Sequence, residues 1–240
     1  MQTYFEEKEI PLTNILSCAT DGAPAMIGKY RGFIGLLKQE IPEVITVHCV
    51  IHRQHLVARN LNITLSNTLQ IVITAINKIK ANPLKDRLFR ELCLKNDEDF
   101  ERLLLHTEVR WLSRGNCLIR FFELFDTVLE FFQTKDSLMF NQLKNKKVEI
   151  AYLADLFSKF NELNLKLQGK NVNLITTKSV IRAFISKLTF YRQNLGRCEI
   201  SHFALLNKLK EYINDANLHV FCEHLEMLKK KKKRRFNDIL

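Results

Sequence analysis

The residues best suited to chemistry lie between Ser17 and His55, where a carboxylate follows a short apolar run. Asp21 follows Thr20, just past the run 12–19, which has the length and apolar character of a buried strand, and it opens the turn sequence Asp-Gly-Ala-Pro. A carboxylate just past the carboxyl end of a strand lies where α/β sheets gather ligands and metal ions. Asp21 is therefore a candidate metal ligand. The alternative is that it only forms the turn or caps the next helix.

A pair of candidate residues lies at the end of the next apolar run. Cys49 and His52 have the two-residue spacing of half a zinc site. Four ligands are needed, and no second Cys/His pair has matching spacing, although His48 and His55 lie close by in the sequence. The spacing alone favours a packed or hydrogen-bonded pair over a bound metal ion.

Composition limits the class of protein. At 240 residues, with 46% hydrophobic and 26% charged residues, the chain is long enough for a sizeable core. No apolar run reaches the roughly 18 residues that span a bilayer, and the acidic N-terminus lacks a signal core. Six scattered cysteines show no disulfide framework. We therefore expect an intracellular protein, nuclear or cytoplasmic, with no membrane partner.

The positive charge is concentrated in the second half of the chain. Residues 1–140 hold 17 Lys and Arg against 17 Asp and Glu, whereas residues 141–240 hold 20 against 9 and account for the whole net charge of +11. Seven consecutive basic residues form the run Lys229, Lys230, Lys231, Lys232, Lys233, Arg234 and Arg235. Such a run suits an anionic partner or a nuclear-import receptor. The alternative is a solvated helix end without a partner.

The periodicity that must position these residues changes along the chain. Strand-like segments are expected at 15–19 and 44–50, with a helix at 25–39 between them. Helical spacing then dominates, and we expect helices at the following ranges: 55–61, 65–79, 84–94, 100–105, 112–133, 148–167, 172–195, 200–214 and 218–233. The many phenylalanines are best explained as helix–helix core.

Four sequence blocks, in this order, resemble the core of hAT-superfamily transposases. They are T-D-G-A-P-A-M at 20–26, H-C-V-I-H-R-Q-H-L at 48–56, L-H-T-E-V-R-W-L-S-R-G at 105–115 and the segment 153–170. The most similar branch is the domesticated one that includes BED-type zinc finger proteins and SCAN domain-containing protein 3.

The resemblance implies a fold class and a domain division. The class is α+β and predominantly α-helical: a partial ribonuclease-H-like α/β core followed by a large helical insertion. The corresponding domains are residues 1–62 for the partial core, 63–228 for the insertion-like domain and 229–240 for a basic tail.

The resemblance also implies roles for single residues. Asp21 matches the second of three acidic positions that hold divalent ions for DNA cleavage, and the other two have no match in this chain. Trp111, flanked by Arg110 and Arg114, matches a tryptophan that stacks on a flipped base, with a core tryptophan as the alternative. The Cys49–His52 pair lies beside the active site in that family. No cofactor is expected for this chain alone, and Mg²⁺ is expected if it is part of a complete catalytic domain.

Three functions remain open at this stage. The leading hypothesis is a truncated transposase-like protein that does not cleave DNA by itself and binds nucleic acid or protein. The alternatives are an internal fragment of an active metal-dependent transposase and a helical scaffold that binds only proteins. Salt-sensitive DNA binding, metal-dependent nicking and capture of protein partners alone would separate the three. The sequence leaves the oligomeric state open.

Overall fold

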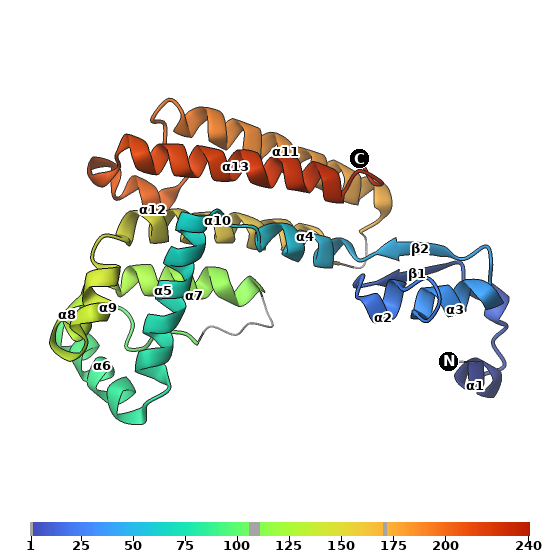
Figure 1. Cartoon of the computed structure of the whole chain (residues 1–240), viewed down its shortest axis with the longest axis horizontal. Helices are drawn as coiled ribbons and strands as arrows, with labels where there is room; N and C mark the ends of the chain where they lie inside the picture. Colours follow the sequence, from blue (N-terminus) through green and yellow to red (C-terminus); the bar gives the residue numbers. More distant parts are fainter. Residues whose placement is uncertain (1, 106–110, 170–171) are drawn as a thin grey trace. The chain divides into compact units, whose positions relative to one another are not determined.

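The computed structural model describes residues 2–105, 111–169 and 172–240, and the chain divides into two compact units, Met1–Leu56 and Val57–Leu240. Helices dominate: the described residues contain thirteen α-helices and two short strands (Figure 1). The fold is therefore predominantly α-helical, as the periodicity predicts. None of the described helices is long and apolar enough to cross a membrane.

The first unit is built on a parallel pair of strands. β1 (Ser17–Thr20) pairs with β2 (Ile45–His48) in a register that runs from Ser17 opposite Ile45 to Thr20 opposite His48. Parallel strands need a crossover connection, and here α2 (Pro24–Ile27) and α3 (Phe33–Glu40) provide it. Two short helical turns precede β1, α1 (Gln2–Glu7) and the 3₁₀ turn η1 (Leu12–Asn14).

The crossover differs from the single helix expected at 25–39. The chain leaves α2 at Gly28 and starts α3 after Gly32, whose amide donates to the Gly28 carbonyl at 2.9 Å. A Cβ on Gly32 would lie 2.3 Å from the Gly28 nitrogen, so only glycine permits this close approach. The core of the unit is small and centres on Leu37, Ile41 and Val44.

The second unit is a helical assembly. Its helices begin with α4, which crosses the unit boundary, and their bounds are α4 (Val50–Ala58), α5 (Ile63–Lys80), α6 (Pro83–Lys95), α7 (Trp111–Glu123), α8 (Phe125–Lys135), α9 (Ser137–Leu143), α10 (Lys147–Lys166), α11 (Leu174–Leu195), α12 (Ala204–Asn207) and α13 (Asp215–Arg235). A 3₁₀ turn, η2 (Lys210–Tyr212), precedes α13.

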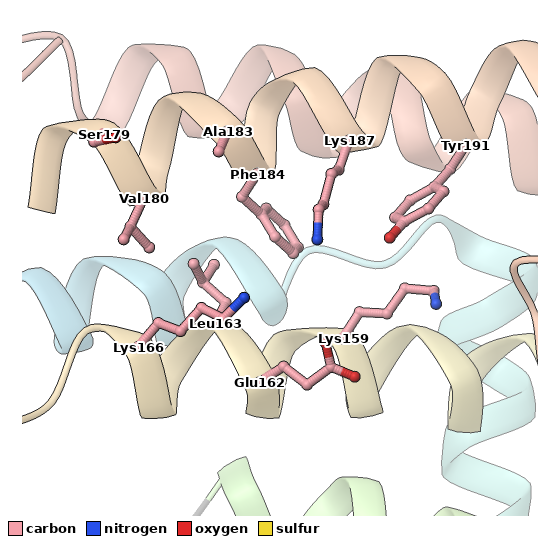
Figure 2. A pocket seen from close by; sticks show the side chains of 10 residues that line it. All are labelled: Lys159, Glu162, Leu163, Lys166, Ser179, Val180, Ala183, Phe184, Lys187 and Tyr191. Atoms are coloured by element: carbon pink, nitrogen blue, oxygen red, sulfur yellow. The ribbon is translucent and has the colours of Figure 1, made fainter. Parts of the chain in front are cut away.

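Helix α10 is the central element of this unit. It packs against α7 on one side and against α12 and α5 on others, and α11 packs along α13 (Figure 1). Because neighbours surround it, α10 buries polar side chains as well as apolar ones, among them Tyr152 and Asp155. A groove remains between α10 and α11 (Figure 2). Phenylalanines 121, 122, 125, 131 and 132 are all buried, which confirms their assignment to the helix–helix core.

The helix expected at 112–133 is wrong in one respect, because it is divided. Leu124 leaves the helical conformation with φ −92° and ψ 15°, separates α7 from α8, and is fully buried. The break redirects the chain so that phenylalanines on both sides of it reach the core. The single helix expected at 200–214 is also wrong, since only α12 and η2 form there. Helix α9 had no counterpart among the expected helices.

The helix expected at 100–105 is absent, and side chains of α7 contact this segment. Nη1 of Arg120 donates to the Arg102 carbonyl at 3.2 Å, and its guanidinium lies 3.3 Å from the centre of the Phe100 ring. Cys117 Sγ contacts the Leu104 carbonyl at 3.3 Å. In a helix over 100–105 these two carbonyls would lie in the last turn, without an intrahelical donor, and here side chains of α7 contact them.

Candidate functional site

The two-stranded sheet brings the first two sequence motifs to one edge. β1 ends at Thr20 and β2 ends at His48, and these two residues are paired in the parallel register. The residues that follow, Asp21 and Cys49, therefore leave the sheet at the same carboxyl edge. The backbone N–H of Cys49 donates to the Thr20 carbonyl at 2.7 Å and continues the ladder beyond the strands.

Asp21 is exposed, and its side chain makes a local contact. Its Oδ1 accepts a hydrogen bond from the Ala23 backbone N–H at 2.9 Å. Ala23 is the N-cap residue of α2, so the carboxylate stabilises the turn that enters this helix. Among the described residues, no hydrogen bond to the other carboxylate oxygen, Oδ2, is present. The metal-binding role of Asp21 stays a prediction.

Gly22 is required where it stands, because the ring of His48 covers it. Its φ of +76° lies in the left-handed region, and a Cβ there would lie 2.6 Å from His48 Cε1. From the sequence, His48 is only a residue near the Cys49–His52 pair, whereas in the structure its ring packs over Gly22. An Asp-Gly pair after a strand indicates a turn, but it does not indicate which side chain covers the glycine.

Cys49 and His52 lie at the start of α4, next to His48. The rings of His48 and His52 are 5.4 Å apart between centroids, and the Cys49 thiol is free and half-buried. Burial, together with the neighbouring His52, lowers the pKa of His55. Within the described ranges, no three His, Cys, Asp or Glu side chains form a group that could hold a metal ion. A metal role for the Cys49–His52 pair stays a prediction.

The structure describes only part of the tryptophan motif. Arg110 lies outside the described residues. Trp111 and Arg114 belong to the first turn of α7, but their side chains lie outside the described part of the chain. The base-stacking role therefore stays a prediction. Gly115, which follows, lets α7 approach α10 closely, since a Cβ there would lie 2.5 Å from Asn161 Nδ2.

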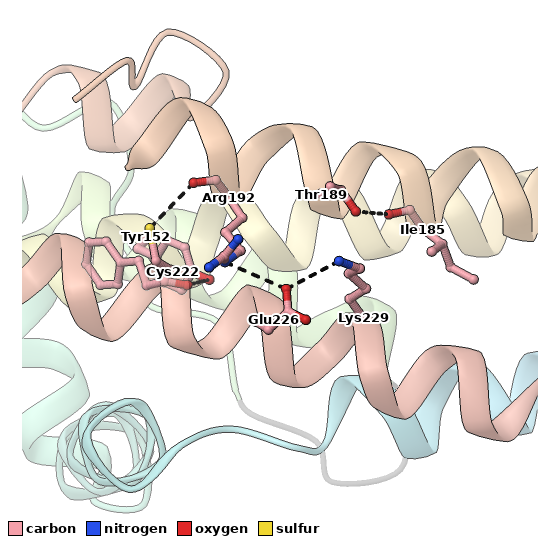
Figure 3. Close-up of polar contacts among 8 residues, drawn as sticks. Tyr152, Ile185, Thr189, Arg192, Cys222, Glu226 and Lys229 are labelled. Atoms are coloured by element: carbon pink, nitrogen blue, oxygen red, sulfur yellow. Dashed lines mark hydrogen bonds and ion pairs between the residues drawn. The ribbon is translucent and has the colours of Figure 1, made fainter. Parts of the chain in front are cut away.

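The basic run from Lys229 to Arg235 forms the last turns of α13. Its residues make different contacts. Lys229 pairs with Glu226 at 3.4 Å, and Arg192 of α11 reaches the same carboxylate at 3.6 Å (Figure 3). Lys231 donates to the Asn60 side chain. Part of the run is therefore bound internally.

The exposed members of the run share one face of the helix. Lys230, Lys233 and Arg234 are exposed, and their spacing of three and four residues places them on one side of α13. Lys232 is fully buried, with its Nζ 4.4 Å from the centre of the Phe184 ring. Burial holds the pKa of Lys232 well below its usual range. One run of basic residues in the sequence therefore gives a buried lysine and an exposed cationic face.

Comparison with known proteins identifies the helical part of the chain. A family model described as the FAM200/GTF2IRD2 helical domain matches residues 48–196, which is more than half of the chain. The chain belongs to this family. General transcription factor II-I repeat domain-containing protein 2 of Bos taurus is 30% identical over 214 residues. That match covers 86% of this chain but only 22% of the relative. No solved structure matches the chain.

The FAM200/GTF2IRD2 relationship confirms the coarser part of the resemblance, descent from a domesticated, transposon-derived protein. The matched range begins at His48 and ends at Gly196, so it includes the Cys49–His52 pair and α4 to α11. The exposed basic face of α13 lies outside it.

A buried hydrogen-bond network, which the sequence did not indicate, links the part of the chain matched by the family model to α13. His224 of α13 contacts the Asn60 carbonyl through Nε2 and the Tyr152 hydroxyl through Nδ1, both at 3.0 Å. A carbonyl only accepts, so Nε2 carries the proton and Nδ1 accepts from the tyrosine. Tyr152 also stacks on Phe221, with ring centroids 4.1 Å apart. No local sequence signal links residues so far apart in the chain.

Proposed function

We propose that this chain is a transposon-derived DNA-binding module that does not cleave DNA by itself. The observation that carries the proposal is the exposed cationic face of α13, formed by Lys230, Lys233 and Arg234. Those three side chains are exposed, whereas Lys229 is held by Glu226 and Lys231 by Asn60. Within the described residues they form no ion pair, so they are available to phosphate groups.

The charge of the chain favours a polyanionic partner. The net charge is +11, and the excess lies entirely in residues 141–240. A basic face of this kind binds the phosphate backbone through release of counterions and carries no sequence preference of its own. Binding should therefore be electrostatic, dependent on salt and independent of base sequence.

The proposed lack of cleavage rests on the number of carboxylates. Two-metal cleavage of DNA needs several converging acidic side chains, and Asp21 alone matches the hAT pattern in this chain. The chain spans 22% of the curated relative, so metal-dependent cleavage by a longer protein is a separate proposal. Mg²⁺ would belong to that longer protein.

Three finer assignments are part of the proposal. The parallel strand pair with its helical crossover is consistent with a piece of a ribonuclease-H-like core. The relationship to the BED-type zinc finger and SCAN domain-containing protein 3 branch rests on the sequence blocks alone. A nuclear location follows from DNA binding, and the basic run would act as a linear import signal only after it leaves the helix.

The test measures the affinity of the 240-residue chain for a short labelled DNA duplex by fluorescence anisotropy. Between about 50 and 200 mM salt we expect a steep, linear fall of log affinity with log salt. Reversal of the exposed face in the variant Lys230→Glu/Lys233→Glu/Arg234→Glu should weaken binding at every salt concentration. It should also reduce the slope by about 2 to 3, because up to three phosphate contacts are lost.

A matched control reverses three exposed lysines elsewhere, in the variant Lys38→Glu/Lys85→Glu/Lys135→Glu. Its net charge equals that of the α13 variant, so any general effect of charge appears in both. Equal weakening by the two variants would show that α13 is not the DNA-binding face. Affinity that does not change with salt would overturn the proposal itself.

A further inference from the structure

A groove between α10 and α11 combines an apolar floor with a cationic rim. Its cavity of about 170 Å³ has room for one large side chain. Leu163 of α10 and Phe184 of α11 form the floor, and Val180 points into it from the same side as Phe184 (Figure 2). Leu163 and Phe184 are almost fully buried, so an apolar group that entered here would meet an apolar surface.

The rim holds two cations that form no ion pair within the described part of the chain. Lys166 comes from α10 and Lys187 from α11, both are exposed, and neither forms an ion pair with the described residues. The third lysine, Lys159, is already used: its Nζ donates to the His202 carbonyl at 2.7 Å and lies 4.9 Å from the Tyr191 ring centre. Two unpaired cations on opposite helices therefore flank the floor.

Some of the side chains with which α11 lines the groove are small. Ala183 and Ser179 are small, exposed residues of α11 that line the groove. Small residues allow the backbone of a bound segment to come close to the helix, as side-chain insertion into the floor requires. Glu162 is the one acidic residue among those that line this groove.

We propose that the α10–α11 groove docks an acidic peptide segment of a partner protein, which inserts one large apolar side chain between Leu163 and Phe184. The cations of Lys166 and Lys187 complement carboxylates on either side of that anchor. A phosphate backbone matches the groove less well, because phosphates cannot fill an apolar floor and would face Glu162. This partner is distinct from DNA, which the proposed function places on α13.

The probe is a fluorescein-labelled peptide of about 14 residues, rich in Asp and Glu, with a single central phenylalanine. Its binding to the 240-residue chain is measured by fluorescence anisotropy at physiological salt. The variant Lys166→Glu/Lys187→Glu should weaken binding at least about fivefold, since both rim charges change sign. A peptide with alanine in place of phenylalanine should also bind more weakly, because the floor then stays empty.

Two further variants keep the test decisive. Lys85→Glu/Lys135→Glu has the same net charge as the rim variant but leaves the groove intact, and it should bind the peptide like the unaltered chain. Ala183→Trp fills the groove from an exposed helix position and should reduce binding without a change in the thermal melt. Equal binding by the rim and control variants overturns the proposal. Displacement of the peptide by a short DNA duplex that the rim variant does not bind would also overturn it, since the groove would then bind nucleic acid.

Discussion

Single buried polar residues connect distant parts of the helical unit, and His224 is the clearest case. Its ring is fully buried between α13, Tyr152 of α10 and the Asn60 carbonyl. Burial lowers the pKa of His224 to about 4, and the positive charge of nearby Lys231 acts in the same direction. The folded chain therefore holds a neutral imidazole at a pH where an unfolded chain would protonate it.

This difference in pKa predicts a loss of stability in mild acid. Between about pH 6.5 and pH 4 the unfolded chain binds a proton that folded His224 does not, so the free energy of unfolding falls as the pH falls. The contribution of His224 should be about 2 kcal/mol smaller at pH 5 than at pH 7. Urea unfolding at both pH values measures it.

The variant His224→Gln isolates this effect from other titrating groups. Glutamine can still donate to the Asn60 carbonyl and accept from the Tyr152 hydroxyl, but it does not titrate. The carboxyl of Asp155, whose pKa is raised by burial, acts in the opposite direction and is present in both proteins. If the unaltered chain and His224→Gln lose equal stability between the two pH values, His224 is not the responsible group.

At the level of elements, the helix ends show which parts of the chain are fixed by long-range contacts. Asn62 caps α5 by accepting from the Leu65 N–H at 3.0 Å, and its Nδ2 also donates to the Val220 carbonyl of α13 at 3.1 Å. Asn82 caps α6 in the same local way, through Leu84 and Lys85, but is exposed. One cap therefore joins two helices, whereas the other stabilises only its own.

The two caps form a matched pair for mutation. Asn82→Ala should lower the free energy of unfolding by about 1 kcal/mol, the usual effect of a lost cap. Asn62→Ala should lower it by about 2 kcal/mol, because it also removes the hydrogen bond to the Val220 carbonyl of α13. Chemical denaturation of the two variants gives the comparison. Equal losses would show that the contact with α13 adds nothing to stability.

At the scale of the whole molecule, the two units differ in the core available to each. The first has two four-residue strands and a small core centred on three buried residues, Leu37, Ile41 and Val44. An isolated pair of short strands is marginal in water. The second unit has a core shared by α5 to α13, in which Leu65, Phe89 and Phe157 are among the buried side chains. Stability should therefore lie in the helical unit.

Separate pieces of the chain test this difference. A protein of residues 48–240, which keeps α4 whole, should retain a helical circular dichroism spectrum and unfold cooperatively. A peptide of residues 1–47 should remain unfolded, because its apolar core is too small to offset the conformational entropy of folding. A non-cooperative melt of residues 48–240 would show instead that the helical unit depends on the first unit.

Much of the architecture follows from local sequence. Helix periodicity predicts α5, α6, α10, α11 and α13 to within a few residues, because each buries a face at three- and four-residue spacing. Sequence periodicity predicts less well where side chains of another element contact the backbone. Segment 100–105 has a helical pattern, but no helix forms there, and Arg120 and Cys117 of α7 contact two of its carbonyls.

By itself, the sequence determined that the chain is mainly helical, that it descends from a transposon and that its positive charge lies near the C-terminus. These properties depend on composition, periodicity and ordered motifs, which are local. Only the tertiary structure decided that Asp21 and Cys49 leave one sheet edge, and that Lys232 is buried while Lys230, Lys233 and Arg234 are exposed. The reason is that strand register and helix packing join residues distant in sequence, and a run of identical lysines does not indicate which of them faces the core.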